Sequence, residues 1–140
     1  MKITNDFKMV IVINDSLQVG LKCNTAAVLA LTLGKKIDGL IDKDLVDGSG
    51  ELHVGLTNQP LPILKSTEKE IKNLKKKALG NKENILIIDI TDAAQITKNY
   101  IDYETKLKSK KTEELKFLGI ALAGSVKDIN SLTGNLSLLR

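Results

Sequence analysis

The chain has 140 residues, of which 42% are hydrophobic and only 3% aromatic, with a formal net charge of +4 at pH 7. This length predicts one domain over residues 1–140, with a core of Leu, Ile, Val and Ala. The few aromatic residues argue against a stacking surface for single-stranded nucleic acid, and the single cysteine excludes an intrachain disulfide and a cysteine-based zinc site.

Targeting signals are not expected from the sequence. Polar residues interrupt the first ten positions, so no signal peptide is predicted. No apolar run approaches the ~20 residues that span a bilayer, so no membrane contact is predicted. We expect a cytoplasmic protein that needs no cofactor.

The first predicted elements are a strand and a helix. Residues 9–13 form a continuous apolar run that ends at a polar turn, which is typical of a strand buried on both faces. Residues 21–33 carry small and apolar side chains at helical spacing and are followed by Gly34 and two lysines, as helix C-termini are. A strand followed by a helix is the start of an α/β layer.

Residues 37–64 are less regular. Val46 and Leu52 flank the turn sequence of residues 47–50, which predicts a hairpin. Two prolines, on either side of Leu61, restrict any strand there to an edge or to a very short one.

The second half of the chain predicts alternating helices and strands. Thr67 and Glu70 have the spacing of a capping box, and an apolar stripe follows it at Ile71, Leu74 and Ala78. The further predicted elements are a strand at 84–90, a helix from 92 to roughly 108, a strand at 115–122, and a short helix between Ser125 and Gly134. This pattern predicts an α/β fold with a small sheet that is covered by helices on both faces.

Three stretches resemble the type II peptidyl-tRNA hydrolases. They are residues 10–20 (VIVINDSLQVG), the strand that leads into Thr91-Asp92-Ala93, and the closing segment of Leu118-Gly119-Ile120 with residues 129–139 (INSLTGNLSLL). Of that family's site residues only Asp92 carries over. The positions that hold a lysine, a glutamine and a histidine in the hydrolases hold Cys23, Ala27 and Ala30 here, and Lys22 lies one residue out of register.

A closer resemblance, over almost the whole chain, is to an uncharacterised bacterial family that shares this fold. It rests on residues 20–21, 24, 26–29, 55–57, 60–64, 91–95 and 132–136. The resemblance implies a mixed sheet of about four strands flanked by helices, a protein that is often a homodimer, and no established activity.

Polar residues gather at two predicted strand ends, and this pattern predicts a cleft that binds a small polar ligand. The expected ligand-binding residues are Asn14, Asp15, Gly20, Asn24 and Gln95. The alternative for Asn14, Asp15 and Gly20 is turn formation, and for Asn24 a solvent-facing position.

Asp92 is the candidate catalytic residue. It follows a buried strand, where its carboxylate would orient water for hydrolysis of an ester or amide, peptidyl-tRNA included. The alternative is a structural role in which Asp92 caps the helix that it begins.

His53 and Cys23 are weaker candidates. His53 is the only histidine, so no metal site is predicted, and we expect it on the surface of the hairpin. Cys23 shares a predicted helix face with Ala26 and Ala30, which favours a small buried residue over a nucleophile.

Two lysine clusters give a third functional hypothesis, binding to RNA phosphates. They comprise Lys69, Lys72, Lys75, Lys76 and Lys77, and Lys106, Lys108, Lys110 and Lys111. Interspersed glutamates dilute the positive field, which favours ordinary solvated helix faces.

Overall fold

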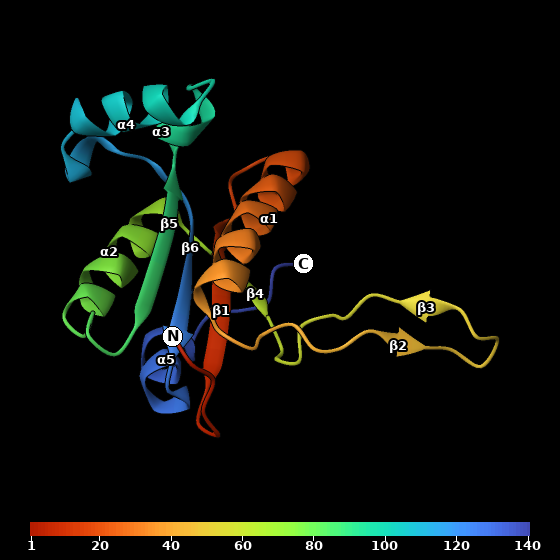
Figure 1. Ribbon diagram of the computed structural model, residues 1–140. Helices are drawn as coiled ribbons and strands as arrows, with labels where there is room; N and C mark the ends of the chain where they lie inside the picture. The colour runs from red at the N-terminus through yellow and green to blue at the C-terminus, as the bar shows by residue number, and fades with distance from the viewer.

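The computed structural model describes residues 1–140, and its centre is a four-stranded sheet of order β4-β1-β6-β5 (Figure 1). The strands are β1 (Lys8–Asn14), β4 (Ile63–Ser66), β5 (Leu86–Thr91) and β6 (Phe117–Gly124). β4 runs parallel to β1, whereas β6 runs antiparallel to both β1 and β5. The C-terminal ends of β1, β4 and β5 therefore lie at one end of the sheet, together with the start of β6. The predicted mixed sheet of about four strands is confirmed.

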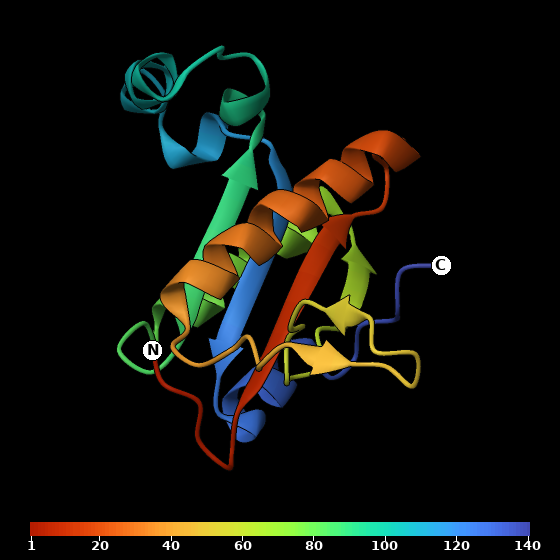
Figure 2. The same cartoon turned by 45° about the vertical axis from the view of Figure 1, so that its right-hand side comes forward.

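Helices cover both faces of the sheet, as predicted. α1 (Val19–Lys36) lies across one face, while α2 (Glu68–Leu79) and α5 (Val126–Thr133) lie on the other (Figure 2). All eight residues of β6 are buried, because this strand is central in the sheet and covered on both sides. The predicted capping box is present at the start of α2, where Thr67 Oγ1 accepts from the Glu70 amide at 3.1 Å.

β1 supplies side chains to both hydrophobic cores. Val10 and Val12 point into the core beneath α2 and α5, whereas Met9, Ile11 and Ile13 point into the core beneath α1. Successive residues of a strand face opposite sides of a sheet, so a continuous apolar run is what a strand covered on both faces requires.

The buried stripe of α1 differs from the predicted one. Thr25, Leu29 and Leu33, spaced four residues apart, are the buried residues of this helix. The prediction that Cys23 is buried is wrong, because its side chain is exposed. With 3.6 residues per turn, a residue two positions before Thr25 points away from the sheet.

The predicted continuous helix from 92 to 108 is also wrong. The chain forms a single turn, α3 (Asp92–Gln95), and then a separate helix, α4 (Tyr100–Lys108). Asn99 starts α4, because its side-chain oxygen accepts from the Asp102 amide at 2.9 Å, and asparagine is a favoured N-cap. A short 3-10 turn, η1 (Thr112–Glu114), then precedes β6, which begins two residues later than predicted.

The irregular middle of the chain contains the predicted hairpin, formed by β2 (Leu45–Val46) and β3 (Leu52–His53). We call residues 41–57 the arm, because they project away from the sheet (Figure 1). The base of the arm is closed by a hydrogen bond from the Asn58 amide to the Leu40 carbonyl, 3.0 Å long. Every residue from 41 to 54 is exposed.

The two edges of the sheet are treated differently. β4 is a short edge strand that begins directly after Pro62, as the prolines predicted, and the C-terminal segment covers its outer side. The covering bonds run from the Lys65 amide to the Ser137 carbonyl and from the Leu139 amide to the Ile63 carbonyl, both 2.9 Å. β5 is the open edge. None of the helices combines the length and the apolar character that crossing a membrane requires.

Candidate functional site

The two predicted polar strand ends lie at the same end of the sheet. Ile13 of β1 and Ile90 of β5 both pair with Gly119 of β6, so a single strand separates them. Two strand spacings correspond to about 10 Å. Asn14 and Asp92, which follow these residues closely, are therefore near neighbours across the start of β6.

Both side chains bind backbone groups where the chain enters β6, rather than facing an open cleft. Asn14 Nδ2 donates to the Phe117 carbonyl at 3.3 Å, and Asp92 Oδ1 accepts from the Lys116 amide at 3.1 Å. A third side chain, Glu68, accepts from the Phe117 amide at 3.3 Å. The interpretation of Asp92 as a cap of its own helix is wrong, since its carboxylate binds Lys116. These groups fix the entry of β6 into the sheet.

The other predicted binding residues lie near the same end of the sheet. Asn14 Oδ1 also accepts from the Ser16 amide at 3.0 Å, which closes the turn after β1. Asp15 is exposed and forms an ion pair with Lys22 at 2.8 Å, and the hydrogen bond from Lys22 holds the pKa of Asp15 below its ordinary value.

The remaining three, Gly20, Asn24 and Gln95, are exposed. Their part in ligand binding stays a prediction, because none of the six predicted residues lines the cavity beside β5.

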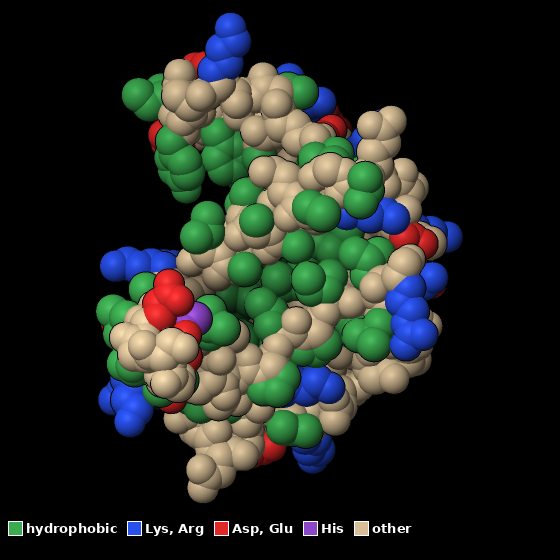
Figure 3. All heavy atoms as spheres, turned by 90° about the vertical axis from the view of Figure 1, so that its right-hand side faces the viewer, with side chains coloured by type: hydrophobic (Ala, Val, Ile, Leu, Met, Phe, Trp, Pro, Cys, Tyr) green, Lys and Arg blue, Asp and Glu red, His purple; other side chains and the backbone are tan.

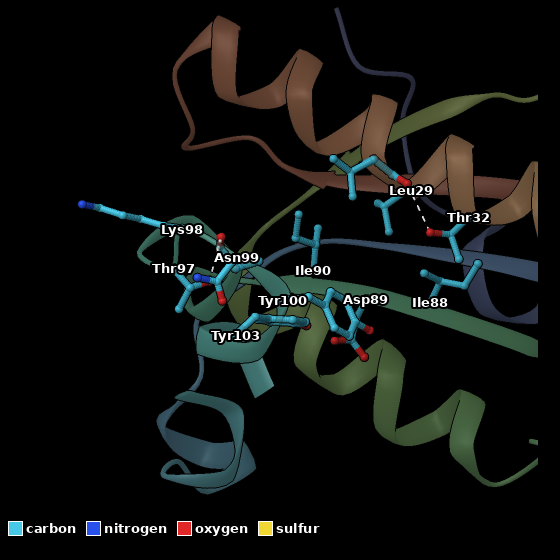
Figure 4. Close-up of a pocket in the computed structure, with 12 residues that line it drawn as sticks. Leu29, Thr32, Ile88, Asp89, Ile90, Thr97, Lys98, Asn99, Tyr100 and Tyr103 are labelled. Carbon is cyan, nitrogen blue, oxygen red and sulfur yellow. Dashed lines mark hydrogen bonds between the residues drawn. The ribbon is translucent and has the colours of Figure 1, made fainter. Parts of the chain in front are cut away.

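That cavity has a volume of about 420 Å³ and lies between α1, β5 and the α3–α4 segment (Figure 4). Its apolar lining comes from Val28 and Leu29 of α1 and from Ile88 and Ile90 of β5. On the opposite side lie residues that the break between α3 and α4 positions: Thr97, Lys98, Asn99, Tyr100 and Tyr103.

Both tyrosines of the chain line this cavity. Their rings meet edge to face, with centroids 5.6 Å apart and planes inclined by 68°. Burial raises the pKa of Tyr103 above its ordinary value, and the negative charge of Asp89 adds to the effect. Tyr103 therefore remains a neutral hydroxyl that can donate a hydrogen bond. Asp89 also forms an ion pair with Lys75, at 2.6 Å.

Sequence reasoning missed the cavity because it treated residues 92–108 as one helix. A single helix would leave no turn to bring its second half beside the open edge of β5. The available signal was Asn99, a preferred N-cap residue placed directly before Tyr100.

The tip of the arm gathers three potential metal ligands that the sequence spacing did not suggest. Ligand atoms of Asp47, Glu51 and His53 lie within 4.8 Å of one another, and His53 Nε2 is 2.8 Å from Asp47 Oδ2. The hydrogen bond with His53, followed by those from the amides of Glu51 and Ser49, lowers the pKa of Asp47. All three residues are exposed, and the bonds of Asp47 serve the turn itself. The predicted surface position of His53 is confirmed.

The lysine clusters are partly paired with acidic residues. Lys72 lies 3.2 Å from Glu68, and Lys108 lies 3.0 Å from Glu104, in each case one helical turn apart. Such pairs are typical of solvated helix faces, and binding to RNA stays a prediction.

Comparison with known proteins gives the family. A model described as "Protein of unknown function (DUF2000)" matches residues 7–140. The chain belongs to the DUF2000 family. No curated protein matches the sequence.

A solved structure has the same fold as this DUF2000 protein. It is the protein of unknown function Atu0240 from Agrobacterium tumefaciens strain C58, which superposes with a TM-score of 0.87 at 19% sequence identity. The alignment covers 98% of this chain and 100% of that one. The likeness therefore extends over the arrangement of the sheet and its helices and is not confined to one motif.

Proposed function

We propose that this DUF2000 protein binds a small molecule in the cavity beside β5. The observation that carries the proposal is that both tyrosines of the chain and an apolar floor line one cavity at the open edge of the sheet. A volume of about 420 Å³ lies within the range of small-molecule sites, which are mostly apolar with a few polar groups.

The lining indicates the class of ligand. Leu29 and Ile90 offer an apolar floor, and the ring of Tyr103 offers a flat wall, so a planar and largely apolar body fits best (Figure 4). The hydroxyls of Tyr100 and Tyr103 make no hydrogen bond within the protein and are free for a polar group of the ligand. Lys98 also belongs to the lining, but its side chain points away from the cavity (Figure 4).

The position of the cavity supports the proposal. In α/β folds ligands bind beside the carboxyl ends of strands, and the cavity lies against the second half of β5. The proposal keeps the predicted place, a cleft near strand ends, but assigns it to side chains of α1, β5 and α4.

Tyrosine fluorescence provides a direct test, because the chain has no tryptophan and both tyrosines line the cavity. The probe is 8-anilinonaphthalene-1-sulfonate, a planar anion whose own emission increases in apolar surroundings. We expect saturable probe emission together with quenching of the tyrosine emission. Absence of saturable binding overturns the proposal.

Matched variants locate the bound probe. Tyr100→Ala is expected to weaken probe binding by a few-fold to about tenfold, which is the range for loss of an aromatic contact. Ile101→Ala is the control, since Ile101 is the next residue of α4, is 76% exposed against 81% for Tyr100, and does not line the cavity. Equal weakening by both variants would place the probe elsewhere.

We further propose that the fold is related to that of the type II peptidyl-tRNA hydrolases. The resemblance of residues 10–20 and 129–139 supports this, as does the mixed four-stranded sheet with helices on both faces.

We also propose that the protein is of bacterial origin and is located in the cytoplasm. The Agrobacterium structure supports the first, and the free cysteine is in keeping with a reducing compartment.

A further inference from the structure

The arm carries an unusual number of exposed apolar side chains. Six large ones lie within residues 41–57, with exposed fractions from 57% to 79%: Ile41, Leu45, Val46, Leu52, Val54 and Leu56. A two-stranded hairpin is marginally stable alone in water, and clustered apolar exposure marks interaction surfaces. The arm therefore has the composition of a segment that packs against another surface.

The backbone of the arm is well defined although its side chains are not buried. Hydrogen bonds cross it at several levels, including one from the Asp42 amide to the Leu56 carbonyl at 3.0 Å. Gly55 allows the two sides to approach closely, since a Cβ atom there would lie 1.8 Å from the Asp42 carbonyl oxygen. Gly50, with φ of +85°, closes the turn. The arm is thus pre-shaped, which reduces the entropy lost on docking.

The body of the protein offers an apolar hollow on the face from which the arm projects. Figure 3 shows hydrophobic side chains in this hollow, with lysine or arginine side chains along the margin opposite the arm. We assign to its lining the following half-buried apolar residues, which pack against the core beneath α1: Leu17, Ala26, Ala30, Leu61, Ile63 and Leu139. The arm extends away from its own sheet (Figure 1), and the hollow lies uncovered beside it in Figure 3.

Charge distinguishes the arm from the body. Residues 41–57 contain four carboxylates and one lysine, a net charge of −3 with His53 neutral, so the remaining residues carry +7 of the total of +4. An acidic arm and a basic body attract each other, and a second copy of the chain offers both partners at once.

We propose that the arm of one copy docks in the hollow of a second copy, and that the exchange is reciprocal about a two-fold axis. Docking takes the six exposed apolar side chains of each arm out of water, and such burial is the main favourable term in most protein association. Two identical arm–hollow contacts are what a closed, self-complementary dimer requires.

Sedimentation velocity of the full chain between about 1 and 200 μM tests the proposal. The native protein is expected to be a dimer. The double variant Leu52→Ser/Leu56→Ser should raise the dimer dissociation constant at least about 100-fold, because four apolar side chains per dimer are lost. Ile101→Ser, an equally exposed position on α4, is the control and should leave the dimer intact.

A mixing experiment separates reciprocal exchange from packing of one arm on the other. Ala30→Glu introduces a negative charge into the hollow and should also give a monomer. Mixing this variant with the arm variant leaves one intact arm and one intact hollow, so heterodimers should reappear at intermediate affinity. A native protein that is monomeric at 200 μM, a dimer unaffected by the arm variant, or mixtures without heterodimers would each overturn the proposal.

Discussion

Thr25 of α1 lies so close to Gly119 of β6 that a Cβ atom at position 119 would be 2.7 Å from Cγ2 of Thr25. The same Cβ would lie 3.1 Å from the carbonyl oxygen of Val12 on the neighbouring strand. Glycine is needed at this point because both the helix and the adjacent backbone are in contact with it. The contact sets how closely α1 approaches the centre of the sheet, and thereby the width of the cavity that α1 borders.

Gly119→Ala is therefore expected to destabilise the protein by about 1–3 kcal/mol, the usual cost of overpacking a filled core. Urea denaturation measures the change in the free energy of unfolding. Gly34→Ala is the matched control, because its added methyl group meets nothing within 4 Å. The substitution also replaces a glycine of α1 by a better helix former. The control should be stabilised by about 0.5–1 kcal/mol. Equal stability of Gly119→Ala and the native protein would show that α1 shifts freely.

Thr25→Val is expected to have the opposite effect. The Thr25 hydroxyl is fully buried and has no hydrogen-bond partner, so valine keeps the shape and removes an unsatisfied polar group. The free energy of unfolding should rise by about 1 kcal/mol in the same urea experiment. A loss of stability instead would mean that the hydroxyl has a partner in solution.

Asp92→Ala should lower the free energy of unfolding by roughly 1–2 kcal/mol, because the Lys116 amide loses its charged acceptor. Asp92→Asn retains an acceptor oxygen and should lose less. The hydrolytic hypothesis is checked with the same variants and an N-blocked aminoacyl-tRNA. Turnover by the native protein that is lost in Asp92→Asn would support a catalytic carboxylate, since that variant stays folded.

The sheet, its covering helices and the hairpin could be predicted because their signals are local. The apolar run of residues 9–13 and the capping residues Thr67 and Ser125 each specify an element through neighbours in the sequence. The candidate site could not be predicted, because the roles of Asn14 and Asp92 depend on the backbone groups that lie opposite them at the start of β6. The backbone of Lys116 and Phe117, distant in sequence, takes up both side chains. Similarly, Cys23 was misplaced because alanines fit either side of a helix, so they do not define its buried stripe.

Thr67→Ala is expected to lower stability by about 1 kcal/mol, since the Glu70 amide at the start of α2 loses its acceptor. Thr67→Ser keeps the hydroxyl and should remain close to the native protein. Thermal unfolding followed by circular dichroism compares the two. Equal losses in both variants would indicate that the threonine methyl, and not the cap, matters.

The raised pKa of Tyr103 predicts that the folded protein loses stability in strong alkali. Its pKa is raised in the folded state by burial and by Asp89, so the unfolded chain releases this proton first as the pH rises. The contribution of Tyr103 is therefore fully present below the ordinary tyrosine pKa and is lost as the pH rises through the folded value. Urea denaturation between pH 9 and 11 should show a shallower decline for Tyr103→Phe than for the native protein. An identical decline in both would contradict the shift.

The central position of β6 has a consequence for synthesis of the chain. β1 and β5 both pair with a strand that the ribosome produces after them, and they do not pair with each other. Until residues 117–124 have left the exit tunnel, a nascent chain can form the β1–β4 pair and its helices but cannot join β5 to them. Completion of the sheet is thus a late event. Until then β1 and β5, both apolar strands, lack the strand that pairs with them.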